Sequence, residues 1–258
     1  MEPILFEKKA PIGWLTLNRP DLRNALSIEL MNKMQKQLNL VAKDRDIRVI
    51  VIKGNGHAFC VGHDMNELVG ENYDIHHFRK IFMVCSNLMK TLHQIPQPVI
   101  AQVHGIAMAA GCQLVAACDL AIAESGTKFC TPGVKIGLFC STPMVPLSRI
   151  IGRRRALDML LTGRFVSAQE AQQFGLVNKV VDPVKLAEET KNYAMDIAQY
   201  SLFTIEFGKN FFYKQIDQDE ISAYNDAIEV MAKNCLAEDA QEGMKAFLEK
   251  RKPTWKDR

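Results

Sequence analysis

Two glycine-containing turns carry the residues of this sequence whose types and spacing favour chemistry. The first turn spans residues 57–64 with the sequence HAFCVGHD, and the second spans residues 104–113 with the sequence HGIAMAAGCQ. Both follow short apolar runs, and open α/β sheets bind their ligands at the ends of such buried strands. The second turn leads into a helix, whose first N–H groups lack internal partners and favour an oxyanion. For either turn alone, tight packing between strand and helix explains the small residues equally well.

Taken together, the two turns resemble the motifs of the crotonase, or enoyl-CoA hydratase/isomerase, superfamily. The similarity pairs FCVGHD with VIAQVHGIAMAAGCQL and extends from LNRPDLRNAL through LTGRFVSAQEA to FLEKRKP near the C-terminus. The resemblance implies an α/β crotonase (ClpP-like) fold of repeated β-β-α units with a C-terminal helical trimerisation region. It further implies a homotrimer or a dimer of trimers, a coenzyme A thioester as the substrate, and no permanently bound cofactor.

The resemblance also implies which residues hold the substrate. It assigns the thioester oxygen to an oxyanion hole made by the backbone N–H groups of Val61 and Ala110, and the loss of one such donor typically costs about 3 to 4 kcal/mol of barrier. Arg23 would lie near the CoA phosphates, although it also fits ordinary surface charge, as does Lys250. The substrate-binding positions that the resemblance implies are Arg23, Val61, His63, Asp64, Met65, Ala110, Cys140 and, reaching a neighbouring subunit's CoA, Phe247 and Lys250.

Two family positions carry residues that cannot perform the family's acid–base chemistry. Hydration needs a base that activates water and an acid that protonates the α-carbon, and the family's hydratases supply two glutamates. Those positions fall on Gln113 and Gly133 in this sequence. An amide has no useful basicity, and each lost role is typically worth about 10² to 10⁴ in rate. We therefore expect an acyl-CoA-binding protein, nominally an enoyl-CoA hydratase/isomerase of fatty acid metabolism, with weak hydratase activity.

Other functions remain open at this level. A non-catalytic acyl-CoA binder or scaffold would keep the oxyanion hole after losing both carboxylates, and an isomerase, decarboxylase or thioesterase would use a different proton donor. Residues 131–143 resemble the subfamily called enoyl-CoA hydratase domain-containing protein 3. The thiols of Cys112 and Cys140 and the hydroxyl of Ser141 fall near the expected thioester, but the sequence identifies no neighbouring base. We therefore favour small, buried and unreactive thiols.

Composition limits the functional class and the cellular location that we expect for the protein. The 258 residues are 48% hydrophobic and 24% charged, and no apolar run approaches the roughly 18 residues of a membrane span, so we expect a soluble protein. Seven cysteines without CxxC spacing and an N-terminus without a secretory or transit signal favour the cytoplasm. A net charge of +3 is too small to favour nucleic acid despite the patch at residues 153–155. The histidine spacing predicts no metal site, and Asp64 is expected to cap a helix beginning at Met65.

The hydrophobic pattern predicts alternating strands and helices followed by a helical C-terminal part. Apolar and β-branched runs predict strands at 12–17, 49–52, 99–103 and 119–123, and three- and four-residue spacing predicts helices at 28–41 and 78–92. Further helices are expected at 143–151, 153–161, 168–174, 184–212, 220–236 and 238–250, with breaks near Gly208 and Asp217. These patterns divide the chain into a core domain at residues 1–200 and a helical region at residues 201–258.

Overall fold

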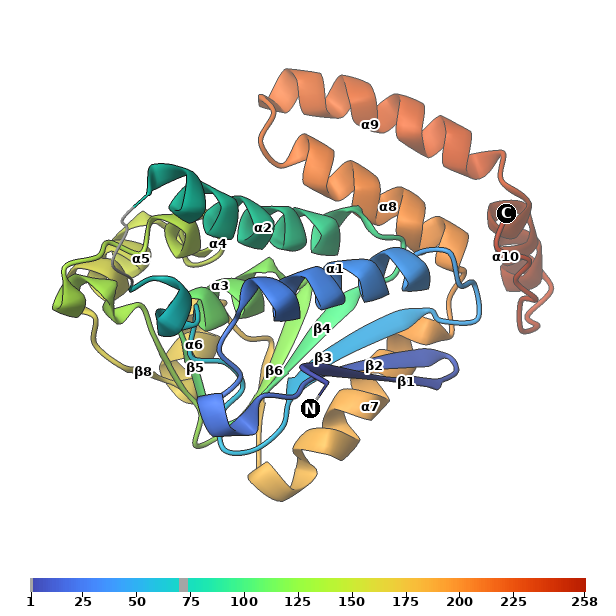
Figure 1. Cartoon of the computed structure of the whole chain (residues 1–258). Coiled ribbons are helices and arrows are strands. Elements are labelled where there is room, and N and C mark those ends of the chain that lie inside the picture. Colours follow the sequence, from blue (N-terminus) through green and yellow to red (C-terminus); the bar gives the residue numbers. More distant parts are fainter. Residues whose placement is uncertain (1, 70–73) are drawn as a thin grey trace.

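The computed structural model describes residues 2–69 and 74–258, and its centre is a six-stranded sheet (Figure 1). The strand order is β1-β2-β3-β4-β6-β9. Only β1 and β2 pair antiparallel, and the remaining neighbours are parallel. Parallel strands are buried on both faces, which explains why they read as continuous apolar runs in the sequence. The strands are β1 (Ile4–Lys9), β2 (Ile12–Leu17), β3 (Val49–Gly54), β4 (Val99–Val103), β6 (Leu120–Glu124) and β9 (Lys179–Val181).

Helices cover both faces of this sheet. On one face lie α1 (Ile28–Val41), α2 (Ile75–Gln94) and α3 (Ala110–Ala117), and on the other lies α7 (Leu186–Ala198) (Figure 1). Successive residues of β3 point to opposite faces, so that Ile50 joins the core beneath α1 while Val51 packs against Ala194 of α7. Helix α1 begins where the Ser27 side chain accepts a hydrogen bond from the Leu30 N–H, as an N-cap does.

A second, three-stranded sheet brings the two glycine-containing turns together. It consists of β5 (Ile106–Met108), β7 (Lys128–Cys130) and β8 (Val166–Ser167). Cys60 in the first turn forms a parallel bridge with Ala107 of β5, which itself belongs to the second turn. Five short helices fill the rest of the chain up to α7. In chain order they are η3 (Pro132–Ile136), α4 (Ser141–Ile151), α5 (Arg153–Thr162), α6 (Ala168–Phe174) and η4 (Pro183–Lys185).

The C-terminal helices differ from the prediction at one boundary. The expected helix at 184–212 is interrupted after Ala198, and Ser201 caps a new helix, α8 (Leu202–Gln215). The predicted break at Gly208 is wrong, because this glycine lies inside α8, where its position is open and a helix tolerates it at modest cost. The break near Asp217 is confirmed, since it separates α8 from α9 (Glu220–Cys235), which is followed by α10 (Glu238–Leu248).

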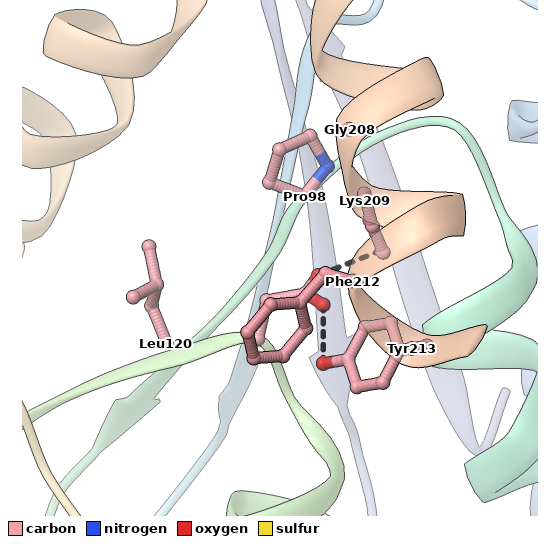
Figure 2. Close-up of a pocket in the computed structure, with 7 residues that line it drawn as sticks. Pro98, Leu120, Gly208, Lys209, Phe212 and Tyr213 are labelled. Atoms are coloured by element: carbon pink, nitrogen blue, oxygen red, sulfur yellow. Dashed lines mark hydrogen bonds and ion pairs between the residues drawn. The ribbon is translucent and has the colours of Figure 1, made fainter. Parts of the chain in front are cut away.

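A buried ion pair attaches α8 to the end of the sheet. The Nζ atom of Lys209 lies 2.7 Å from Oδ2 of Asp119 and also donates to the carbonyl oxygens of Leu92 and Gln97. The hydroxyl of Tyr213 donates to Oδ1 of the same aspartate at 2.7 Å (Figure 2). Every hydrogen of the ammonium group thus has an acceptor, which is what allows a lysine to be buried. Within residues 2–69 and 74–258, no helix combines the length and apolarity that a membrane crossing needs.

Candidate functional site

A cavity of about 840 Å³ lies where the two turns meet the segment at residues 132–143. Its volume falls in the range of small-molecule sites, and its wall is mostly apolar. The short helix η2 (Met65–Glu67) and the end of the first turn, at Val61, His63 and Asp64, contribute to its wall. The wall consists of Leu22, Ala25, Val61, His63, Asp64, Met65, Asn66, Leu68, Phe82, Met108, Ala109, Ala110, Pro132, Gly133, Lys135, Ile136, Leu138, Phe139, Cys140, Ser141, Thr142 and Pro143.

The second turn points one amide at this cavity. Ala109 has φ 49° and ψ −116°, a conformation that L-residues rarely adopt, and its own N–H donates to the Cys130 carbonyl at 2.9 Å. The sharp change of direction places Ala110 on the cavity wall as the first residue of α3. Its N–H therefore has no acceptor within the helix, and no other group in the described parts of the chain accepts from it. This donor sits at the positive end of the helix dipole.

In the first turn, the sequence assigned the substrate-facing amide to Val61, and the structure places that amide elsewhere. The Val61 N–H donates to the Arg23 carbonyl at 3.2 Å, and the Asp64 N–H donates to the Leu26 carbonyl at 3.1 Å. In a regular strand, amides three residues apart point to opposite sides. Here both amides donate to the segment at residues 23–26, and the intervening Gly62 has φ 104°, which breaks the alternation of a regular strand.

This break in the alternation leaves the His63 amide facing the other way. Leu26 bridges to His63 through the Gly62 carbonyl and the Asp64 N–H, so the His63 N–H is directed away from Leu26 and has no acceptor among the described residues. A Cβ atom on Gly62 would lie only 3.3 Å from the nitrogen of Ala110. The two turns therefore approach each other closely here, with the unpaired amides of His63 and Ala110 on neighbouring segments.

An ion pair between Arg19 and Asp64 stabilises the end of the first turn. Arg19 Nη2 lies 2.7 Å from Asp64 Oδ2, and Arg19 Nη1 donates to the Ala25 carbonyl at 2.8 Å. Asp64 also accepts from the Asn66 N–H at 3.0 Å, which makes it the N-cap of η2, as predicted. Burial works against the charge, but the hydrogen bonds from Arg19 and Asn66 hold the pKa of Asp64 below its ordinary value. This carboxylate is thus occupied and weakly basic.

The helix η2 is connected in turn to the beginning of α1. The carboxylate of Glu67 accepts from the Ile28 N–H, with oxygen to nitrogen distances of 2.9 and 3.2 Å. A helix N-terminus has several amides without internal partners, so a carboxylate from another segment stabilises it. One wall of the cavity is thereby tied to a helix of the main sheet.

Residue 133, to which the resemblance assigns the second glutamate of the family, is sterically closed in this chain. A Cβ atom on Gly133 would lie 2.7 Å from the Leu138 carbonyl oxygen and 2.8 Å from Cys140 Sγ. The segment at residues 138–140 therefore occupies the space into which a side chain at residue 133 would extend. Gln113, to which the resemblance assigns the first glutamate, is buried in α3 and is not part of the cavity wall. Its side-chain oxygen is 3.9 Å from Cys85 Sγ.

The cysteines around the cavity are protonated at neutral pH. Burial raises the pKa of the Cys140 thiol, the one predicted cysteine on the wall, despite a hydrogen bond from the Gly133 backbone. Cys112 is fully buried in α3, and burial raises its pKa further. A protonated thiol is a poor nucleophile, so Cys112 and Cys140 are expected to be unreactive.

Three predicted substrate-binding residues do not line the cavity of a single chain. Arg23 is exposed, next to the wall residue Leu22, and its backbone has φ 49°. Phe247 lies in the last turn of α10 and Lys250 follows that helix, which Figure 1 shows on the far side of the molecule from α4 and α5. Phe247 is 82% exposed. A contribution of these two residues to a neighbouring subunit's site stays a prediction.

The comparison with protein families covers nearly the whole chain. A family model described as enoyl-CoA hydratase/isomerase matches residues 7–258. The chain belongs to the enoyl-CoA hydratase/isomerase family. For this family member, both turns, the cavity and the C-terminal helices fall inside the matched range.

Individual relatives place this hydratase/isomerase family member more narrowly, with enoyl-CoA hydratase domain-containing protein 3. The mitochondrial protein of that name from Xenopus laevis is 45% identical over 251 residues, covering 97% of this chain and 85% of that protein. The Homo sapiens protein is 46% identical over 241 residues, covering 93% of this chain and 79% of that protein. The human crystal structure has a TM-score of 0.95 at 43% identity, covering 98% of this chain and 100% of that chain. An enoyl-CoA hydratase structure from Mycobacterium smegmatis has a TM-score of 0.95 at 43% identity, with 99% of each chain covered. The predicted crotonase fold is confirmed.

Proposed function

We propose that this protein binds an acyl-CoA thioester and polarises its carbonyl oxygen with the backbone N–H groups of His63 and Ala110. The observation that carries the proposal is the pair of unpaired amides on neighbouring turns of an apolar cavity. Preorganised donors of this kind stabilise an enolate that develops from a thioester, and they act most strongly where water is excluded. His63 thus replaces Val61 in the proposed oxyanion hole.

The reaction that follows polarisation is constrained by what surrounds the carbonyl. Gln113 and Gly133 provide neither a base nor an acid, and the Asp64 carboxylate is already paired with Arg19. We therefore propose weak hydratase activity at most. The closed position at Gly133 favours the alternative of a non-catalytic acyl-CoA binder, because no carboxylic acid side chain fits at residue 133. Isomerase, decarboxylase and thioesterase chemistry remain candidates for the same polarised thioester.

Removal of a single amide tests the oxyanion hole. Proline is tolerated at the first position of a helix, where it deletes the N–H and keeps a helical φ, so Ala110→Pro removes the proposed donor itself. We expect this variant to lose at least tenfold in affinity for butyryl-CoA but little for free CoA, which has no thioester carbonyl. Glu220→Pro, at the first position of the exposed helix α9, is the matched control. Equal losses for butyryl-CoA and CoA would contradict the assignment.

A hydration assay distinguishes the enzyme from the binder. Crotonyl-CoA hydration by this protein is compared with that of a relative that carries both glutamates, alongside calorimetric titration of each protein with butyryl-CoA. Binding with turnover lower by about 10² or more agrees with the loss of acid–base groups. Turnover equal to that of the relative would contradict weak hydratase activity, and absence of binding would contradict the proposal as a whole.

The C-terminal helices favour self-association, and we propose a homotrimer or a dimer of trimers. Helix α9 has no buried residue, and its exposed side chains include Ile221, Tyr224, Ile228 and Met231, spaced along one face. We expect light scattering after size exclusion to give a trimer or hexamer mass and Ile228→Asp to lower it. A monomer mass for the unaltered protein would contradict this proposal.

A reducing compartment suits the protein, and the cytoplasm is our proposal for it. All seven cysteines are free, and five of them are buried. The relatives named mitochondrial leave a second reducing compartment as the alternative. Imaging of the tagged full-length protein separates the two.

A further inference from the structure

The ammonium group of Lys135 is a charged group on the cavity wall that the proposed oxyanion hole does not use. Among the described residues of the wall, only Asp64 and Lys135 are charged, and the Asp64 carboxylate is paired with Arg19. Lys135 is exposed and forms no hydrogen bond or ion pair with the parts of the chain that the structure describes. Its neighbours on the wall, Ile136 and Leu138, are apolar. The described wall is therefore an apolar surface with one positive charge that no other group neutralises.

The side chain of Lys135 lies beside the strand that adjoins the proposed oxyanion hole. Burial raises the pKa of the Cys130 thiol to about 12, and the Lys135 ammonium acts against that rise, so its charge lies near the end of β7. The Cys130 carbonyl accepts from the Ala109 N–H at 2.9 Å, directly before the Ala110 amide. The lysine stem passes over the end of α5, where a Cβ atom on Gly163 would lie 3.0 Å from Cε. The ammonium thus belongs to the side of the cavity that β7 and η3 form.

An uncharged acyl chain in this cavity would leave the ammonium without a partner. Water solvates the group while the cavity is open, but a ligand that fills an apolar cavity displaces water from its wall. A charged group that loses water without gaining a partner costs free energy, whereas a carboxylate neutralises an ammonium and accepts its hydrogen bonds. The cavity is therefore better suited to an acyl chain that carries a negative charge.

We propose that Lys135 binds a carboxylate at the far end of the acyl chain, so that the site prefers monothioesters of dicarboxylic acids. This inference rests on the proposed function, because the amides of His63 and Ala110 have to hold the thioester carbonyl for the chain to extend toward η3. The phosphates of CoA are another anionic partner for the same ammonium. The position of Lys135 near the hydrogen bond between Ala109 and Cys130, next to the carbonyl-binding amide, favours the acyl carboxylate.

Pairs of thioesters that exchange a terminal methyl group for a carboxylate test this preference. Calorimetric titrations at pH 7 compare succinyl-CoA with butyryl-CoA and glutaryl-CoA with pentanoyl-CoA. The unaltered protein is expected to bind the carboxylate compound about tenfold more tightly in at least one pair, the lower end of what a hydrogen bond to a charged group contributes. The preference should decrease as the salt concentration rises, because salt screens an accessible ion pair.

Substitutions of two exposed lysines show whether the preference belongs to this position. Lys135→Met removes the charge and keeps an unbranched side chain, so it should bring the affinity ratios to about one, and Lys135→Glu should favour the methyl compounds. Lys36→Met is the matched control, because Lys36 is an exposed lysine of α1 that has no ion pair among the described residues and is not part of the wall. This control should keep the full ratio.

The outcomes separate this inference from the proposed function. Ratios near one in the unaltered protein, with the thioesters bound, would overturn the inference alone, and so would a full ratio in Lys135→Met. An equal loss of affinity for succinyl-CoA, butyryl-CoA and free CoA in Lys135→Met would assign the ammonium to the CoA phosphates and would likewise overturn it. Binding of none of the thioesters would overturn the proposed function and the inference with it.

Discussion

A Cβ atom on Gly133 would lie 2.8 Å from the Sγ atom of Cys140, closer than such contacts occur in folded proteins. The close approach means that the glycine and the segment at residues 138–140 depend on each other. A glutamate at residue 133, the position that the resemblance assigns to it, does not fit by substitution alone, because the space is filled by the main chain as well as by the thiol.

Substitutions at Gly133 measure this dependence directly. We expect Gly133→Ala to lower the free energy of unfolding by about 1 to 3 kcal/mol, the usual cost of overpacking, as measured by urea denaturation. Gly126→Ala, where a Cβ atom meets nothing within 4 Å, is the control and should change little. Gly133→Glu should be at least as destabilised and should gain no crotonyl-CoA hydration. A stable Gly133→Glu variant with fast hydration would show that the segment moves aside.

At the strained residue before α3, a substitution is expected to stabilise the protein. Ala109 has a positive φ without being glycine, and such conformations cost of order 1 to 3 kcal/mol. We therefore expect Ala109→Gly to raise the free energy of unfolding by about 1 kcal/mol, measured by thermal and urea denaturation. Ala107→Gly, in the regular strand β5, should instead lower it. A loss of stability in both variants would indicate that the Ala109 conformation is not strained.

The buried ion pair of α8 should be expensive to break from one side. Lys209→Met leaves the Asp119 carboxylate buried with only the Tyr213 hydroxyl and a backbone amide, and we expect a loss of about 3 to 5 kcal/mol. Tyr213→Phe removes one neutral donor to a charged group and should cost about 1.5 to 3 kcal/mol. Lys214→Met, on the same helix but in an exposed ion pair, should cost under about 1 kcal/mol. Similar losses for Lys209→Met and Lys214→Met would contradict the burial of the pair.

The pKa of His63 predicts a specific loss of stability in acid. The folded protein holds this pKa at about 4 through burial, whereas the unfolded value is 6.5. Between these values the unfolded chain binds the additional proton, so the free energy of unfolding falls as pH falls from 6.5 to 4, by about 3 kcal/mol. His63→Phe removes this contribution, so its stability should decline less than that of the unaltered protein over the same window. Parallel declines in urea denaturation would rule out a depressed pKa.

Sequence patterns predicted the layered fold because burial leaves a direct record in residue type. The run Val49–Ile52 is apolar because both faces of β3 are covered, and the spacing from Leu30 to Val41 follows from one buried face of α1. The site was predicted less completely, since motif similarity located the first turn but not its free amide. Which N–H is unpaired depends on the φ of Gly62, a backbone angle that residue types do not specify. The closure around Gly133 likewise depends on the path of residues 138–140.

The hydrogen bond between Glu67 and the Ile28 amide connects the cavity wall to the first turn of α1. Deuterium enters such an amide only when the bond opens, so the exchange rate at Ile28 records how often η2 separates from the helix. A ligand that rests on Met65 and Leu68 would hold η2 in place and slow that exchange, although Ile28 itself is not part of the wall. One backbone amide outside the cavity thus provides a signal of occupancy that needs no enzymatic turnover.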